Sequence, residues 1–363
     1  MRRSLSSFEL SIRSPTLFPN RFMPAEVLPT DTTALLAAAV ARAAERLRAG
    51  EVVGVPTETV YGLAANALDP NAVARIYAVK GRPAHNPIIV HVASRAMARE
   101  CSSDWTALAE RLAAAFWPGA LTLVVARASH IPEVVTAGGT TVGVRWPQHP
   151  FMNAVIRACG FPLAAPSANL ANRLSPTNAS RVLSQLGDQL SLIVDGGDCN
   201  VGIESTVVDA TGELPRILRP GMIDAPTIFA AAGFAFSPTP GSVLPPGPLR
   251  SPGLLAKHYS PRAQLAVCAW KNDRDLERQM ASLGARADRT FVLAHTYLPH
   301  SLPPSQVILI PDDAEAFARA LYAQLHRCDD AGAEWILVEE LPDLPSWAGV
   351  ADRLRRASVS PGG

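Results

Sequence analysis

The chain has 363 residues, of which 48% are hydrophobic and 18% are charged, with a formal net charge of +1. This length and composition exclude a disordered or fibrous chain and favour two globular domains. The near balance of 33 basic and 32 acidic side chains argues against a dedicated nucleic-acid coat but allows a local basic patch.

Cysteine usage and hydropathy predict a cytoplasmic protein. The five cysteines are widely scattered and form no Cys-x-x-Cys pair, so we expect buried thiols in a reducing compartment and not a zinc or redox site. No apolar run approaches the roughly 20 residues of a membrane span, so no membrane contact is expected. Residues 1–30 are rich in Ser, Arg and Pro and are expected to be a disordered or non-native extension.

The first predicted domain, residues 31–236, alternates helices and strands. Apolar residues recur at helical spacing from Asp31 to Leu47, with Thr30 or Asp31 as the cap and Gly50 as the stop. Further helices are expected at Asn71–Val79, Trp105–Phe116 and Phe151–Cys159. Strands are expected at Val52–Val55, Ile88–Val92, Leu121–Val125, Val142–Arg145, Leu163–Ala165, Leu192–Val194, Thr206–Asp209 and Arg216–Leu218. This order predicts an α/β fold with a twisted sheet of parallel and antiparallel strands.

A composition break separates this domain from the rest of the chain. Residues 237–262 are rich in Pro and Gly, which is typical of a stiff linker. Residues 263–356 then predict a smaller α/β domain, and residues 357–363 a tail. Its expected strands and helices are Leu265–Ala269, Asp273–Leu283, Thr290–Ala294, Ala314–His326 and Ile336–Val338.

Polar and cationic residues follow the first buried strand and the helix after it. The loop Thr57-Glu58-Thr59 comes first, followed by Lys80-Gly81-Arg82-Pro83 and Asn86-Pro87. Loops at strand ends of an open α/β sheet hold anionic ligands, and Arg offers a rigid fork to phosphate oxygens. The alternative is that Lys80 and Arg82 only complement the helix C-terminus, with Gly81 as its stop.

Three further groups permit both a functional and a structural interpretation. His91 is a candidate ligand contact or a core histidine, and no second His or carboxylate stands at metal-ligand spacing. Ser167 and Asn169 follow a short strand and supply directional hydrogen bonds or an ordinary turn. Arg145 and Arg219 each end a strand, where they either form an anion pocket or are solvated on the surface.

Together these motifs resemble the YrdC-like L-threonylcarbamoyladenylate synthases. The segments that carry the resemblance are Pro56–Leu63, Lys80–Pro83, Asn86-Pro87, Pro166–Asn169, Glu204–Val207 and Arg219–Gly221. Ser251–Pro261 resembles the linker signature of the two-domain form, so the resemblance runs from about Asp31 to near the C-terminus. It implies a YrdC-like catalytic domain and a Rossmann-like C-terminal domain.

The resemblance implies a nucleotidyltransferase, which condenses L-threonine, bicarbonate and ATP into threonylcarbamoyl-AMP and pyrophosphate for tRNA threonylcarbamoyladenosine formation. Lys80 and Arg82 are the implied catalytic residues, with Lys80 on the phosphates. The implied ATP contacts are Arg82, Asn86, Thr141, Ser167, Ser175, Arg219, Lys257, His258 and Tyr259. The implied threonine contacts are Thr59, His91, Arg145, Ala165 and Ser205.

Cofactor and partner expectations follow from the same resemblance. Because no acidic cage is evident, we expect Mg²⁺ to be held by ATP phosphates and water, with no protein ligands. The linker around Lys257-His258-Tyr259 is expected to act as a lid over a labile carbamate. The implied partner is the downstream tRNA threonylcarbamoyl-transfer machinery, with weak RNA binding.

Two other functions fit part of the pattern, and a purely structural role for the C-terminal unit also stays open, because its sequence shows no motif of its own. One is a double-stranded RNA-binding module without catalysis, which the near-neutral charge disfavours. The other is a carbamoyl-transfer maturation enzyme that shares the domain, but such proteins carry zinc-finger cysteine pairs, which this sequence lacks.

Overall fold

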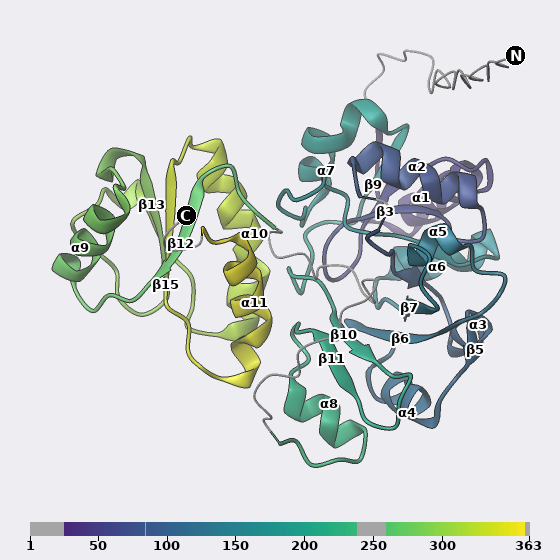
Figure 1. Ribbon diagram of the computed structural model, residues 1–363. Coiled ribbons are helices and arrows are strands. Elements are labelled where there is room, and N and C mark those ends of the chain that lie inside the picture. Colours follow the sequence, from purple (N-terminus) through teal and green to yellow (C-terminus); the bar gives the residue numbers. More distant parts are fainter. Residues whose placement is uncertain (1–24, 84, 238–258, 360–363) are drawn as a thin grey trace, which may run out of the picture.

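The computed structural model describes residues 25–83, 85–237 and 259–359, which form two α/β domains (Figure 1). The first helix, α1 (Thr33–Arg48), begins after Thr32, whose hydroxyl accepts a hydrogen bond from the Leu35 N–H at 3.2 Å. The cap is therefore Thr32 and not Thr30 or Asp31. Ala39, Ala43 and Leu47 form the buried face that the helical spacing predicted.

The larger domain is built on a mixed sheet, which confirms the predicted fold class. Its strand order is β1-β9-β2-β3-β8-β4-β7-β6-β10-β11, and β5 pairs with β6 beside this path. The strands are β1 (Glu26–Pro29), β2 (Val53–Val55), β3 (Gly62–Asn66), β4 (Val90–His91), β5 (Ser102–Asp104), β6 (Leu121–Arg127), β7 (Thr141–Arg145), β8 (Leu163–Ala164), β9 (Leu192–Asp195), β10 (Thr206–Asp209) and β11 (Arg216–Arg219). Strands β4 and β7 run parallel, whereas β8 runs antiparallel to β4.

Helices cover this sheet, and separate clusters of buried apolar side chains pack against it. The helices are α2 (Pro70–Lys80), α3 (Arg95–Glu100), α4 (Ala107–Phe116), α5 (Glu133–Thr136), α6 (Pro150–Cys159), α7 (Ala179–Leu186) and α8 (Ala225–Ala231), with a short 3-10 turn η1 (Gly187–Gln189). None of the helices in the described part of the chain is both long and apolar enough to cross a membrane.

The folded part of the chain begins earlier than predicted. Glu26–Pro29 was expected to belong to a disordered or non-native extension, but it forms β1 and pairs in parallel with β9. This strand has only four residues, Glu-Val-Leu-Pro, and polar and apolar side chains do not alternate along it, so the sequence gives no strand pattern. Its order depends on the neighbouring strand.

The smaller domain is a four-stranded parallel sheet with strand order β12-β15-β13-β14. Its elements are β12 (Gln264–Cys268), α9 (Asp273–Leu283), η2 (Ala287–Arg289), β13 (Thr290–Ala294), η3 (Pro304–Gln306), β14 (Val307–Leu309), α10 (Ala314–Asp330), β15 (Trp335–Glu339), η4 (Pro345–Trp347) and α11 (Ala348–Ala357). In Figure 1, α10 and α11 lie on the side of this sheet that faces the larger domain.

The two domains share one apolar cluster. Leu174 and Ile203 of the larger domain belong to the same buried cluster as Leu321 of α10 and Val350 of α11. The backbones also approach closely, because a Cβ atom on Gly349 would lie 2.8 Å from the Gly221 carbonyl group. Residues 238–258, most of the predicted linker, lie outside the described residues.

Candidate active site

A pocket lies where the polar motifs of the larger domain meet. Its wall includes Thr59 from the β2–β3 loop, Arg82 after α2, His91 on β4 and Arg145 at the end of β7. The other predicted residues in the wall are Ala165, Ser167, Ser205, Arg219 and Tyr259. Most of the predicted ATP and threonine contacts therefore surround one pocket.

The β2–β3 loop is shaped by its own threonines. The Thr57 hydroxyl accepts from the Thr59 N–H at 3.2 Å and donates to the Val60 carbonyl at 2.6 Å. Bonds from a Thr side chain to the backbone two or three residues ahead favour a tight turn over a continued strand. The turn brings Thr59 to Arg145, whose Nη1 donates to the Thr59 hydroxyl at 2.8 Å.

Arg145 is held by a buried ion pair. Its Nη2 lies 2.8 Å from Oε1 of Glu58, and the two side chains are only 4% and 7% exposed. Its Nε donates to the Gly119 carbonyl at 3.2 Å. Burial tends to raise the pKa of Glu58, but the Arg145 cation and the Gln148 N–H hold that pKa below its ordinary value. The anionic Glu58 therefore orients Arg145 in the pocket wall.

His91 is a neutral imidazole in the wall. Burial, followed by the nearby Arg145 cation, lowers the pKa of His91 to about 3. Its Nδ1 has no hydrogen-bond partner within the described residues. The ring thus lines the pocket and keeps an unsatisfied nitrogen, while its contact with a ligand stays a prediction.

Lys80 lies behind the wall and not in it. Its ammonium group is buried and donates to the carbonyls of Ser167 and Asn169, and to Oδ1 of Asn169 at 3.4 Å. Burial lowers the pKa of Lys80 well below its ordinary value. Lys80 thus holds the turn that presents Ser167, while its contact with phosphate stays a prediction.

Gly81 and Arg82 turn the chain from α2 into the site. Gly81 ends the helix with a φ of +58°, a conformation that costs glycine little. Arg82 then donates from Nε to the Asn86 carbonyl at 3.1 Å and from Nη2 to the Pro87 carbonyl at 2.8 Å. Burial lowers the pKa of Arg82 to about 10, so it remains a cation at neutral pH.

Arg219 is hydrogen-bonded to Ser205, and both residues line the pocket. Its Nε and Nη2 donate to the Ser205 carbonyl at 3.1 and 3.0 Å, and Nη2 also reaches the Ser205 hydroxyl at 3.2 Å. The Ser205 hydroxyl lies 2.8 Å from that of Thr122 on β6. The start of β10 is therefore tied to both neighbouring strands.

Several predicted ATP contacts lie outside this wall. Asn86 is buried, and its Oδ1 has no partner within the described ranges. Ser175 is buried and donates to Oε1 of Glu204 at 2.6 Å. Thr141 is at the opposite end of β7 from Arg145 and borders a second, shallower hollow. Lys257 and His258 lie outside the described residues.

Some site residues were not assigned from the sequence. Tyr61 lines the pocket, and its hydroxyl donates to the Gly197 carbonyl at 2.7 Å. Glu204 also lines the pocket and is 7% exposed. The available signal was an acidic residue placed directly before a buried strand, since such a carboxylate needs a cationic partner. Its partner, Arg353, is 149 residues away and belongs to the other domain.

The wall combines three guanidinium groups, of which those of Arg145 and Arg219 are buried and that of Arg82 is half-buried. The nearby carboxylates of Glu58 and Glu204 are already ion-paired with arginines. Within the described ranges, no group of three or more His, Cys, Asp or Glu residues is placed to hold a metal ion. Such a wall suits a ligand that carries phosphate and carboxylate groups.

Comparisons with known proteins point to one family. Residues 45–221 match the Sua5/YciO/YrdC family model, described as telomere recombination, and residues 230–359 match the threonylcarbamoyl-AMP synthase C-terminal domain. A threonylcarbamoyl-AMP synthase of Pyrococcus abyssi is 37% identical over 319 residues, which cover 87% of this chain and 93% of the relative. One from Bacillus subtilis is 37% identical over 328 residues, with 88% and 92% covered.

Solved structures agree with these sequence matches. Two structures of P. abyssi Sua5, each 35% identical, cover 92% of this chain and 96% of their own. Their TM-scores are 0.82 for a double-alanine variant and 0.80 for the complex with L-threonine.

Proposed function

The chain belongs to the Sua5/YciO/YrdC family of threonylcarbamoyl-AMP synthases, and we propose that its pocket condenses L-threonine, bicarbonate and ATP into threonylcarbamoyl-AMP and pyrophosphate. This makes the protein a transferase of the nucleotidyltransferase class. The observation that carries the proposal is the single wall in which a neutral His91 and the guanidinium groups of Arg82, Arg145 and Arg219 meet.

We assign the part of the wall around Arg145 to threonine. The guanidinium group suits the threonine carboxylate, and Thr59 and the neutral His91 provide hydrogen-bonding groups beside it. Ala165 and Ser205 complete the proposed threonine contacts. The solved complex of the P. abyssi protein with L-threonine supports threonine as a substrate.

We assign the part of the wall around Arg82 and Arg219 to ATP, with Ser167 and Tyr259 beside them. The proposed contacts also include Asn86, Thr141, Ser175, Lys257 and His258. Magnesium belongs to this substrate: we expect Mg²⁺ to arrive bound to the phosphates of ATP, because the carboxylates nearest the pocket are paired with arginines.

The chemistry needs positioning more than a protein nucleophile. Threonine's amine and bicarbonate form a carbamate and water, and the carbamate oxygen attacks the α-phosphorus of ATP. The bond from that phosphorus to the bridging oxygen breaks, and pyrophosphate leaves with its electron pair. Arg82 and Arg219 would hold the phosphates and balance the charge that develops on them, while Arg145 holds the amino acid in line.

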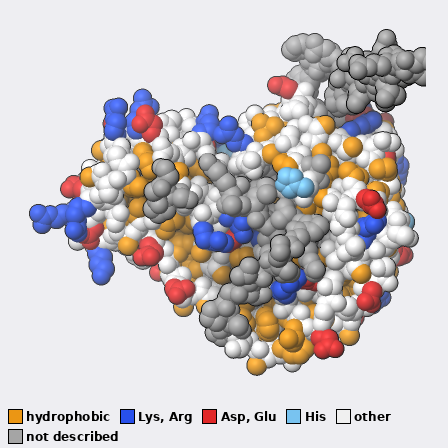
Figure 2. All heavy atoms as spheres, viewed as in Figure 1, with side chains coloured by type: hydrophobic (Ala, Val, Ile, Leu, Met, Phe, Trp, Pro, Cys, Tyr) orange, Lys and Arg blue, Asp and Glu red, His pale blue; other side chains and the backbone are white. Residues whose placement is uncertain are grey.

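We propose that the protein works in the cytoplasm and passes its product to the tRNA threonylcarbamoyl-transfer machinery. Its five cysteines are buried and unpaired, as suits a reducing compartment. On the face shown in Figure 2, acidic and basic side chains are interspersed over both domains. This distribution is compatible with only weak RNA binding.

A threonine-dependence assay tests the function. Purified protein is incubated with labelled bicarbonate, threonine and ATP, and we expect pyrophosphate release that requires threonine, with label in the nucleotide product. Arg82→Ala should abolish pyrophosphate release. The control is Arg95→Ala, which should not, because Arg95 is an exposed arginine paired with Glu110 on the surface. No threonine-dependent product from the wild-type protein would overturn the function, and an unchanged rate in Arg82→Ala would remove Arg82 from its role.

A further inference from the structure

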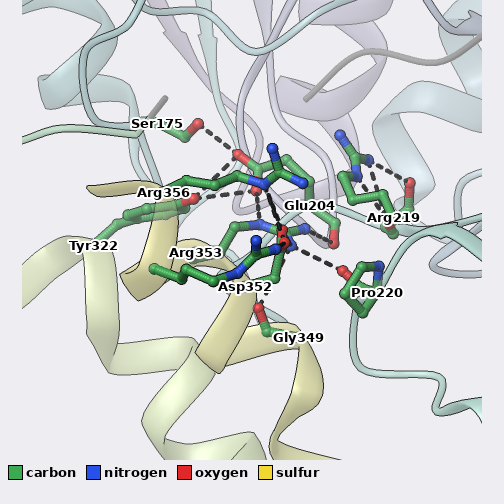
Figure 3. A network of polar contacts seen from close by, with 11 residues as sticks. Ser175, Glu204, Arg219, Pro220, Tyr322, Gly349, Asp352, Arg353 and Arg356 are labelled. Atoms are coloured by element: carbon green, nitrogen blue, oxygen red, sulfur yellow. Dashed lines mark hydrogen bonds and ion pairs between the residues drawn. The ribbon is translucent and has the colours of Figure 1, made fainter. Parts of the chain in front are cut away.

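The second domain places one buried arginine directly beneath the pocket wall. Arg353 of α11 is 1% exposed, although arginine is rarely buried without a specific role. Its Nε donates to Oε2 of Glu204 at 2.8 Å, its Nη2 to the Glu204 carbonyl at 3.0 Å, and its Nη1 to the Pro220 carbonyl at 2.8 Å. Figure 3 shows this side chain reaching from α11 to Glu204. All three nitrogens therefore bind groups of the larger domain.

Glu204 depends on this cation. Burial would raise the pKa of Glu204, but the charges of Arg353 and then Arg219, with a hydrogen bond from Ser175, lower it to about 2. Tyr322 of α10 also donates to Oε2 of Glu204, at 3.1 Å. The second domain thus supplies two of the groups that hold this carboxylate.

The bonds to Glu204 are continuous with the pocket wall. Glu204 itself lines the pocket, and the next residue, Ser205, binds Arg219 through its carbonyl and hydroxyl groups. Because Arg353 binds both the carboxylate and the backbone carbonyl of Glu204, a shift of Arg353 would move the backbone that carries Ser205.

Arg353 also supports an aromatic part of the wall. Its guanidinium carbon lies 5.3 Å from the centre of the Tyr259 ring, within the range of a cation–π contact. Tyr259 is 1% exposed, lines the pocket and packs at a ring distance of 6.1 Å from Tyr322. One cation therefore contacts two separate wall residues.

Domain docking alone does not explain this arrangement. The apolar cluster that includes Leu174, Leu321 and Val350 already joins the domains. A buried ion pair contributes little net stability compared with apolar groups of the same volume, because both charges must be desolvated. What the pair does supply is a defined geometry for the groups that it binds.

We propose that Arg353 is a positioning residue, through which the second domain completes the active site by holding Glu204 and Tyr259 in the pocket wall. For its kinetic effect this inference rests on the proposed function. It concerns how that site is assembled, and it assigns the second domain a part in the reaction without direct contact with the reacting atoms.

The test compares Arg353→Lys and Arg353→Met with Arg355→Lys. Lysine keeps the charge but lacks the planar fork that reaches Glu204 and Pro220 together. We expect Arg353→Lys to unfold at nearly the wild-type urea midpoint while kcat/KM for ATP falls on the order of tenfold, since small misplacements of binding groups carry such costs. In Arg353→Met, kcat/KM for ATP should fall further than in Arg353→Lys. Arg355 is on the same helix and its side chain is 72% exposed, so Arg355→Lys should keep wild-type kinetics.

Hydrogen exchange provides a readout that does not depend on activity. Both Arg353 variants should accelerate amide exchange at residues 203–206 and 259–260 relative to Arg355→Lys. Wild-type kinetics together with unchanged exchange at these residues would overturn the positioning role, as would a loss of activity that only follows the fraction of unfolded protein. If the wild-type protein forms no threonine-dependent product, the proposed function fails, and the exchange comparison still decides the role of Arg353.

Discussion

Arg145 uses its three nitrogens in three directions. They reach Gly119, Thr59 and Glu58, so the orientation of the guanidinium group is determined before any ligand binds. A single ammonium group cannot reproduce these directions. The role of Arg145 is therefore sensitive to geometry as well as to charge.

Arg145→Lys should raise the KM for threonine about tenfold or more, which corresponds to the loss of a charge-assisted hydrogen bond. The KM for ATP should change much less, because the proposed phosphate contacts are Arg82 and Arg219. Steady-state kinetics with each substrate varied in turn measure the two constants. Arg99→Lys, at an arginine whose side chain is 51% exposed, is the matched control. Equal changes in both constants would contradict the assignment of Arg145 to threonine.

His91 makes the folded protein sensitive to acid. The pKa of His91 is about 3 in the folded state against an ordinary 6.5, so below pH 6.5 the unfolded chain binds a proton that the folded protein does not. The free energy of unfolding therefore falls as the pH decreases from 6.5 towards 3. The fold thus loses free energy of unfolding at acid pH because it keeps the imidazole of His91, in the pocket wall, neutral.

His91→Gln should remove this contribution. Between pH 6 and pH 4, the unfolding free energy of the wild-type protein should fall more steeply than that of the variant, by about 1.4 kcal/mol per pH unit for one proton. Urea unfolding at several pH values gives both slopes. Parallel slopes would show that His91 is not held neutral.

At the scale of elements, strongly periodic segments of the sequence were predicted correctly as helices and strands. Strands that form only by pairing with distant segments could not be predicted from the sequence. Asp273–Leu283 and Thr290–Ala294 were predicted with their observed bounds. The strand β3, Gly62–Asn66, was missed because its Gly and Ala residues have little strand preference, and it forms only by pairing with β2 and β8. Ile88–Val92 was predicted as one strand, but only Val90–His91 pairs as a strand.

The sequence motifs indicated many of the residues that line the pocket but not the contacts that these residues make. The motifs identified Arg82, Arg145 and Arg219, whose side chains line one pocket. They did not indicate that Lys80 is occupied by backbone carbonyls, since its partners lie 87 and 89 residues further along the chain. The sequence also did not indicate that Glu204 pairs with Arg353 of the second domain, because the two residues are 149 positions apart.

Gly349 lies in helix α11, where the helix packs closely against the larger domain. Alanine normally stabilises a helix relative to glycine by about 0.5–1 kcal/mol. Here the added Cβ would lie 2.8 Å from the Gly221 backbone, so Gly349→Ala should lower the unfolding free energy and the turnover rate. Gly212→Ala is the control, because a Cβ there meets no atom within 4 Å. A Gly349→Ala protein more stable than wild type would contradict the close packing of α11 on the larger domain.

At the scale of the whole molecule, the larger domain contains apolar clusters of its own. Its pocket residue Glu204, however, is bound by Arg353 of the smaller domain. Deletion of the chain after Phe236 should therefore leave a folded larger domain that makes little product. Circular dichroism and pyrophosphate release measure the two properties separately. Full activity of the truncated protein would show that neither the linker nor the second domain is needed for synthesis.

The position of Tyr259 carries a thermodynamic consequence. The ring lines the pocket and also belongs to the apolar cluster that both domains share. A ligand that binds better when this ring is in place must strengthen the association of the domains, and by linkage the associated state must bind that ligand more tightly by the same factor. Affinity for nucleotide and cohesion between the domains are thus two measures of a single coupling free energy.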